Sequence, residues 1–170
     1  FFFVFLIEFA FTFIPKSHGS HGSYASKIWF RKYWHPINSY GFRDEEPINI
    51  DSAIFFIGDS FTAGHGIKNI KFRVSNLVDQ KLQDFSVINI SRNGADTRLE
   101  YEMMLSFIEE SKIKPLKIVL QYFGNDIDKA AIRNGLNFSR LEKDHNYVLK
   151  HLISSSCAIN YFHWQYPPTG

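Results

Sequence analysis

Three short polar turns hold the residues of this chain that are best suited to chemistry. They are Gly58-Asp59-Ser60, Asn93-Gly94 and Gly124-Asn125-Asp126, and each follows an apolar run. A serine hydroxyl just after a strand can act as a nucleophile, and backbone N–H groups in such a turn can stabilise an oxyanion. Gly94 would add an unobstructed N–H group and Asn125 a side-chain amide. A serine with three such donors is suited to acyl transfer.

The apolar runs before the three turns are typical of buried parallel strands, and the stretches between them have helical spacing. The predicted strands are 52–57, 85–90 and 117–123, and the predicted helices are 72–82 and 98–111, the second capped by Asp96 or Thr97. Alternating strands and helices predict an α/β fold with right-handed crossovers and a parallel sheet. Ligands bind such sheets at the carboxyl ends of the strands, so the three turns should converge on one edge.

Three other known motifs do not fit these turns: the nucleophile elbow, the phosphate loop and the dinucleotide-binding fingerprint. Thr62 stands where the nucleophile elbow G-x-S-x-G needs its second glycine. The segment 64–68 lacks phosphate-loop spacing, and no dinucleotide fingerprint follows the first strand. His65 is close to Ser60 in sequence, but a general base usually comes from a facing loop, so we do not assign it that role.

Each residue of the three turns also has a structural interpretation. Ser60 could cap a helix, and the glycines could provide turns with positive φ. Asn125 and Asp126 could form Asx turns. We interpret Asp59 and Asp126 as structural, holding their turns through backbone N–H groups.

Taken together, the three blocks resemble the SGNH (GDSL-type) hydrolase superfamily. The Gly58-Asp59-Ser60, Gly94 and Gly124-Asn125-Asp126 blocks occur in the family's order, each at the end of a predicted strand. The segment 38–43, Asn-Ser-Tyr-Gly-Phe-Arg, is similar to a lead-in of bacterial members that follow a membrane segment. The resemblance covers roughly residues 34 to 164.

The resemblance implies a three-layer, flavodoxin-like SGNH hydrolase fold and a serine esterase mechanism. Ser60 would be the nucleophile, and the oxyanion hole would comprise the backbone N–H groups of Ser60 and Gly94 with the Asn125 side chain. The substrate would be an ester, such as an O-acyl group on a glycan or a lipid, and no metal or organic cofactor is implied. An acyltransferase of the same fold and a non-catalytic carbohydrate-binding pseudoenzyme are alternative functions.

The base of that family is a histidine in an Asp-x-x-His block, and the 170 residues contain no such block. The chain also starts with Phe1 rather than Met. We therefore expect a fragment at both ends, in which residues 51–170 are the N-terminal part of the hydrolase domain. Without its base this fragment should be inactive, whereas the full-length protein should be an enzyme. The alternative is a complete chain that lacks a base.

The segment 1–14 is apolar apart from Glu8 and Thr12, and we predict a partial transmembrane or signal-anchor helix. Its phenylalanines surround the helix axis, which disfavours a buried amphipathic helix. Residues 15–50 would be a linker and the lead-in loop. The chain would then bind a membrane through this helix with its domain extracytoplasmic. Basic residues after the helix leave the orientation open.

The composition excludes several other classes of protein. A 45% hydrophobic content excludes a mainly disordered chain, and a net charge of +2 gives no nucleic-acid footprint. Cys157 is the single cysteine, so no internal disulfide is possible. His18, His21 and His35 lack the spacing of metal ligands. We predict a hairpin within 138–149 and a final helix at 151–164.

Overall fold

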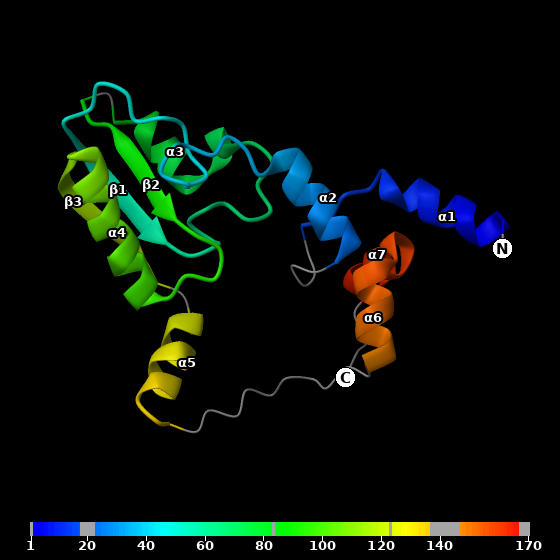
Figure 1. The fold of residues 1–170 in the computed structure, drawn as a ribbon. Coiled ribbons are helices and arrows are strands. Elements are labelled where there is room, and N and C mark those ends of the chain that lie inside the picture. The colour runs from blue at the N-terminus through cyan, green and yellow to red at the C-terminus, as the bar shows by residue number, and fades with distance from the viewer. Residues whose placement is uncertain (1, 18–22, 83, 123, 137–146, 167–170) are drawn as a thin grey trace. The chain divides into compact units, whose positions relative to one another are not determined.

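Three parallel strands in the order β2-β1-β3 form the sheet of the computed structural model (Figure 1). They are β1 (Ser52–Gly58), β2 (Val87–Ser91) and β3 (Lys114–Gln121). The α/β class with a parallel sheet is therefore confirmed, and the arrangement is compatible with a flavodoxin-like fold. The structure describes residues 2–17, 23–82, 84–122, 124–136 and 147–166, without the side chains at 125, 126, 128 and 129.

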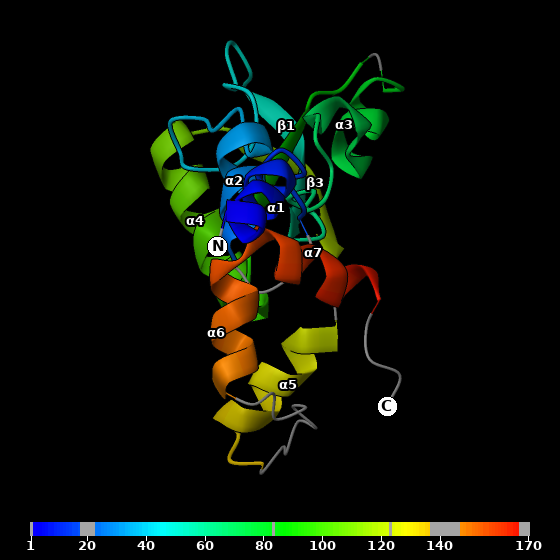
Figure 2. The same cartoon turned by 90° about the vertical axis from the view of Figure 1, so that its right-hand side faces the viewer.

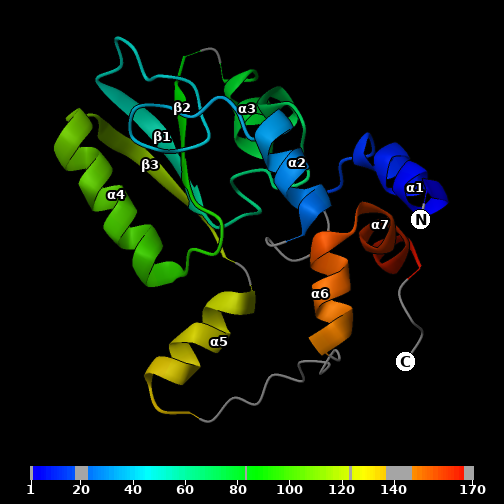
Figure 3. The same ribbon diagram turned by 45° about the vertical axis from the view of Figure 1, so that its right-hand side comes forward.

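The chain divides into two units, residues 35–140 and a second unit made of residues 1–34 and 141–170. The first unit contains the sheet, the 3-10 helix η1 (Ile70–Phe72) and the helices α3 (Val74–Asp79), α4 (Thr97–Ser111) and α5 (Gly124–Arg133). Figures 1 and 3 show α3 and α4 on opposite faces of the sheet, as right-handed crossovers in this strand order require.

Helix α4 matches its predicted range closely, because Asp96 caps its start by accepting a hydrogen bond from Leu99 N at 3.0 Å. Helix α3 is shorter than the predicted 72–82. The backbone of Arg73 is extended and serves as the N-cap, so the residues before it form η1 instead of a continuous helix.

The apolar core lies between the sheet and α4, and Phe107 of α4 is its centre. Its ring is 4.8 Å from that of Tyr40, 6.0 Å from Phe42 and 5.5 Å from Phe55, all in edge-on geometry. Such aromatic pairs add to the burial of apolar area. The lead-in segment is therefore part of the α/β unit, where it covers one side of α4.

Strands β1 and β3 differ in their surroundings. Every residue of β1 from Ala53 to Gly58 is buried, which explains its unalternating apolar sequence. By contrast, the apolar side chains of β3 are 39–51% exposed. Among the described residues β3 pairs with β1 alone, and Pro115 lies where their register shifts.

The described residues of the second unit form four helices: α1 (Phe2–Thr12), α2 (Tyr24–Tyr33), α6 (Tyr147–Ser155) and α7 (Cys157–Gln165) (Figure 2). Helix α1 packs on α7, with Phe11 5.1 Å from the Tyr161 ring. The Glu8 carboxylate accepts hydrogen bonds from Cys157 N at 2.9 Å and from the Ser156 hydroxyl. A carboxylate is favourable at a helix N-terminus, so Glu8 secures this contact.

The predicted membrane helix corresponds to α1, which has no buried residue and whose Phe2 is 76% exposed. Within the described ranges, no helix combines the length and the apolarity that crossing a membrane requires.

Two parts of the second unit differ from the sequence expectations. Helix α2 forms inside the expected linker, because Ser23 caps it and Ala25, Ser26 and Trp29 bury one face. The final helix is two helices, since Ser156 ends the first segment and caps α7 through Ile159 N at 3.0 Å.

The hairpin predicted within 138–149 is wrong for residues 147–149, which begin α6. Residues 138–146 lie outside the described part.

Candidate active site

The three strands end side by side. Gly58 at the end of β1 is the register partner of both Ser91 of β2 and Gln121 of β3. The segments that carry Ser60, Gly94 and Asn125 therefore leave the sheet along one edge, and the serine turn follows the central strand. This convergence was expected from the parallel order alone. The third segment, which was expected to be a polar turn, is the start of helix α5.

Ser60 lies half-buried in a series of turns that spans residues 59–66. Its carbonyl oxygen accepts a hydrogen bond from His65 N at 2.8 Å, and Asp59 O accepts one from Ala63 N at 3.0 Å. No side chain among the described residues is hydrogen-bonded to Ser60 Oγ. The helix-cap interpretation of Ser60 does not fit, because α3 begins only at Val74.

Asp59 has the structural role expected for it. Its buried carboxylate accepts a hydrogen bond from Phe61 N at 2.8 Å and so closes the first turn after β1. The corresponding side chain of Asp126 lies outside the described residues. Asp59 therefore holds the turn that carries Ser60.

Thr62 fastens the serine turn to both neighbouring strands. Its hydroxyl donates to Gln121 Oε1 at 3.0 Å, and its carbonyl oxygen accepts from Asn89 Nδ2 at 2.9 Å. Gly58 makes room for this contact, because a Cβ there would lie 2.0 Å from Thr62 Oγ1. The residue that breaks the nucleophile-elbow motif thus anchors the turn at the sheet edge.

The variant Gly58→Ala is expected to destabilise the α/β unit by about 1–3 kcal/mol, because the added methyl group displaces Thr62. Urea unfolding followed by circular dichroism measures this change. Gly124→Ala is the matched control, since a Cβ at Gly124 meets nothing within 4 Å. Equal unfolding midpoints for the Gly58 variant and the wild type would contradict the packing argued for Thr62.

Gly94 has a φ of 72°, and a Cβ there would meet nothing within 4 Å. Glycine is therefore favoured by the backbone conformation and not by lack of space. The turn-forming interpretation of Gly94 therefore fits the structure.

Asn125 lies in the first turn of α5, close after the end of β3. Its side chain is outside the described residues. Arg133 at the other end of α5 forms an ion pair with Asp96, the residue that caps α4.

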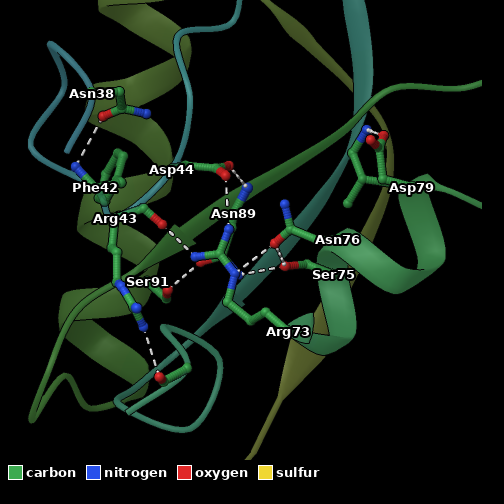
Figure 4. Close-up of polar contacts among 12 residues, drawn as sticks. Asn38, Phe42, Arg43, Asp44, Arg73, Ser75, Asn76, Asp79, Asn89 and Ser91 are labelled. Atoms are coloured by element: carbon green, nitrogen blue, oxygen red, sulfur yellow. Dashed lines mark hydrogen bonds and ion pairs between the residues drawn. The ribbon is translucent and has the colours of Figure 1, made fainter. Parts of the chain in front are cut away.

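A buried polar network that sequence reasoning missed lies on the α3 face of the sheet (Figure 4). Arg73 Nη2 contacts Asp44 Oδ1 at 2.7 Å, and Arg73 Nε donates to Asn76 Oδ1 at 2.8 Å. The other oxygen of Asp44 accepts from Asn89 N at 2.8 Å. The network joins Asp44, which follows the lead-in, to α3 and β2, and Asn89 links it to the serine turn through Thr62 O.

Burial shifts the ionisation of this network. It raises the pKa of Asp44 above its ordinary value, although the adjacent Arg73 charge acts in the opposite direction. Burial also lowers the pKa of Arg43 to about 10, with a further contribution from Arg73. Arg43 therefore stays a cation at neutral pH.

A metal centre finds no support in the residues that the structure describes, where no three His, Cys, Asp or Glu side chains gather. No protein-family model matches the chain, and no curated protein or solved structure compared with it is significantly similar. Function is therefore inferred from the chemistry of the sheet edge.

Proposed function

We propose that the full-length protein containing this chain is an SGNH-type serine hydrolase that cleaves an ester through an acyl-enzyme on Ser60. The observation that supports this most strongly is the common level at which β2, β1 and β3 end. The serine turn therefore follows the middle strand, with the Gly94 turn after one neighbouring strand and the start of α5, which carries Asn125, after the other. A nucleophile flanked by donors on both sides is the arrangement that acyl transfer needs.

In the proposed reaction, Ser60 Oγ attacks the ester carbonyl while a general base takes the hydroxyl proton. The resulting oxyanion accepts hydrogen bonds from the backbone N–H groups of Ser60 and Gly94 and from the Asn125 amide. The C–O bond to the leaving alcohol then breaks, the alcohol takes the proton from the base, and water hydrolyses the acyl-enzyme. In this proposal the general base is the histidine of an Asp-x-x-His block, which the 170 residues do not contain.

A groove along α4, which reaches the end of β2 at Arg92, supports a polar substrate such as an O-acylated glycan. It has a volume of about 340 Å³, lies between the lead-in and α4, and is lined among others by Tyr40, Arg92, Glu102 and Glu110. Arg92 follows β2 directly, two positions before Gly94. Aromatic and charged groups together offer both stacking and hydrogen bonds to sugar hydroxyl groups.

The exposed apolar surface of α1 supports the proposal that the protein is tethered to a membrane. Four of its phenylalanine side chains are 56–76% exposed, namely Phe2, Phe3, Phe5 and Phe9, whereas Phe11 packs on Tyr161. Such a surface is suited to contact with lipid. In this proposal the α/β unit acts on the extracytoplasmic side.

A serine-directed fluorophosphonate probe tests the proposed function in the full-length protein. Peptide mapping by mass spectrometry should find the adduct on Ser60, and Ser60→Ala should abolish it. Ser154→Ala is the control, because Ser154 is also half-buried but lies on α6. Absence of labelling, or equal labelling of the Ser60 variant, would reject the proposal.

A further inference from the structure

Arg43 contacts the turns that follow Ser60 with both ends of its guanidinium group. Nη1 donates to Gly64 O at 2.7 Å and to Ala63 O at 3.2 Å, and Nη2 donates to Ile67 O at 2.7 Å. The residue is 1% exposed. One side chain from the lead-in thus binds three carbonyl oxygens of the segment 63–67.

One of these contacts leads directly to the serine. The peptide unit between Gly64 and His65 is held at both ends, since its carbonyl accepts from Arg43 and its N–H donates to Ser60 O at 2.8 Å. Hydrogen bonds in such a chain polarise and strengthen one another. The position of the Arg43 guanidinium therefore fixes the orientation of the Ser60 carbonyl, and with it the peptide plane that follows the serine.

Arg43 is itself held in place from the opposite side. Its backbone carbonyl accepts a hydrogen bond from Arg73, which is paired with Asp44 at 2.7 Å. Gly64 leaves the space that both arginines need, because a Cβ there would lie 2.9 Å from Arg73 Cδ and 3.3 Å from Arg43 Nη1. The guanidinium thus has little freedom to move relative to the serine turn.

A buried cation is an expensive way to stabilise a fold, because apolar side chains of similar volume often do as well. An apolar residue could fill the space of Arg43, but it could not bind three carbonyl groups at defined positions. The planar guanidinium group provides that geometry, and a lysine ammonium does not.

We propose that Arg43 is a positioning residue for Ser60, which holds the segment 60–67 so that the serine hydroxyl and N–H face the sheet edge. The Arg73–Asp44 pair secures Arg43 in this role. The inference rests on the proposed serine hydrolase function for the reactivity of Ser60.

The test uses the variant Arg43→Lys in the full-length protein. This variant keeps the positive charge but loses the planar set of N–H donors. Fluorophosphonate labelling of Ser60 in the folded protein should slow by about 100-fold, the scale expected for a misplacement of about 1 Å. Amide hydrogen exchange at Ala63, His65 and Ile67 should become about tenfold faster, as expected for the loss of one net hydrogen bond. The exchange of β1 and β2 should not change.

Arg98→Lys is the matched control, because the Arg98 side chain is 71% exposed and pairs with Glu102 on the surface of α4. It should alter neither measurement. Arg73→Lys is the second variant, which keeps Arg43 but loosens its backbone. It should accelerate the exchange of the same three amides even if Arg43→Lys does not fold.

The outcomes separate the two proposals. Unchanged amide exchange in both variants overturns the inference, and so does faster exchange with undiminished Ser60 labelling. A wild-type protein that is not labelled at all overturns the proposed function. In that case faster exchange supports the part of the inference that assigns the turn to Arg43, and unchanged exchange refutes it.

Discussion

The variant Ser60→Ala should lower the proposed ester turnover of the full-length protein by at least about 10⁴-fold while leaving its stability almost unchanged. A loss of this size is expected when a triad member is removed and only the oxyanion hole and substrate binding remain. Among the described residues no side chain is hydrogen-bonded to Ser60 Oγ, so the substitution removes no polar contact seen in the structure. Initial rates on a chromogenic acetate ester measure turnover, and urea unfolding measures stability.

A loss of turnover without a loss of stability distinguishes a catalytic serine from a structural one. We expect the free energy of unfolding to change by less than about 0.5 kcal/mol, as for substitutions away from packed or bonded groups. Ser154→Ala should retain full turnover. A Ser60 variant that keeps more than a tenth of the wild-type rate would show that another group carries the reaction.

The second large effect is expected for Asp44→Ala, which should destabilise the α/β unit by about 3–5 kcal/mol. The substitution leaves the buried guanidinium of Arg73 without its carboxylate partner and Asn89 N without an acceptor. Domains are commonly stable by only about 5–15 kcal/mol, so the loss is a large fraction of the total. Urea unfolding at neutral pH measures it.

A surface ion pair provides the comparison for this prediction. Glu102→Ala breaks the exposed contact with Arg98 on α4 and should change the free energy of unfolding by less than about 1 kcal/mol. Equal effects of the Asp44 and Glu102 variants would mean that the buried network contributes no more than a solvated pair.

The sheet could be predicted from the sequence because its signals are local. The run 52–57 is apolar without alternation, and Gly58 ends it, so a buried strand and its turn follow from a few adjacent residues. The same holds for α4, whose start is marked by Asp96. Parallel order then brings the three turns to one edge without further information.

The buried polar residues that hold the serine turn could not be predicted in this way. Arg43, Arg73 and Asn89 come from three segments far apart in the chain, and their contacts exist only after the sheet and α3 have formed. The one local sign was Asn89, a polar residue between Ile88 and Ile90 in a buried strand. Its side chain faces the polar network while its neighbours face the apolar core.

The N-terminal segment shows the same dependence on distant partners. Glu8 interrupts the apolar run of the sequence, and a lone carboxylate is costly in an apolar setting. In the structure this carboxylate meets the start of α7, nearly the whole chain length away. Its use as a helix cap required knowledge of that partner.

The tight space around Gly64 constrains how this sequence can diverge. A side chain at position 64 would collide with Arg73 and approach Arg43, and the backbone there has a φ of 78°, which other residues rarely adopt. Changing any one of the three positions therefore leaves either a collision or an empty space beside the serine turn. In related proteins that lack this arrangement, the residues at positions 43, 64 and 73 should therefore covary.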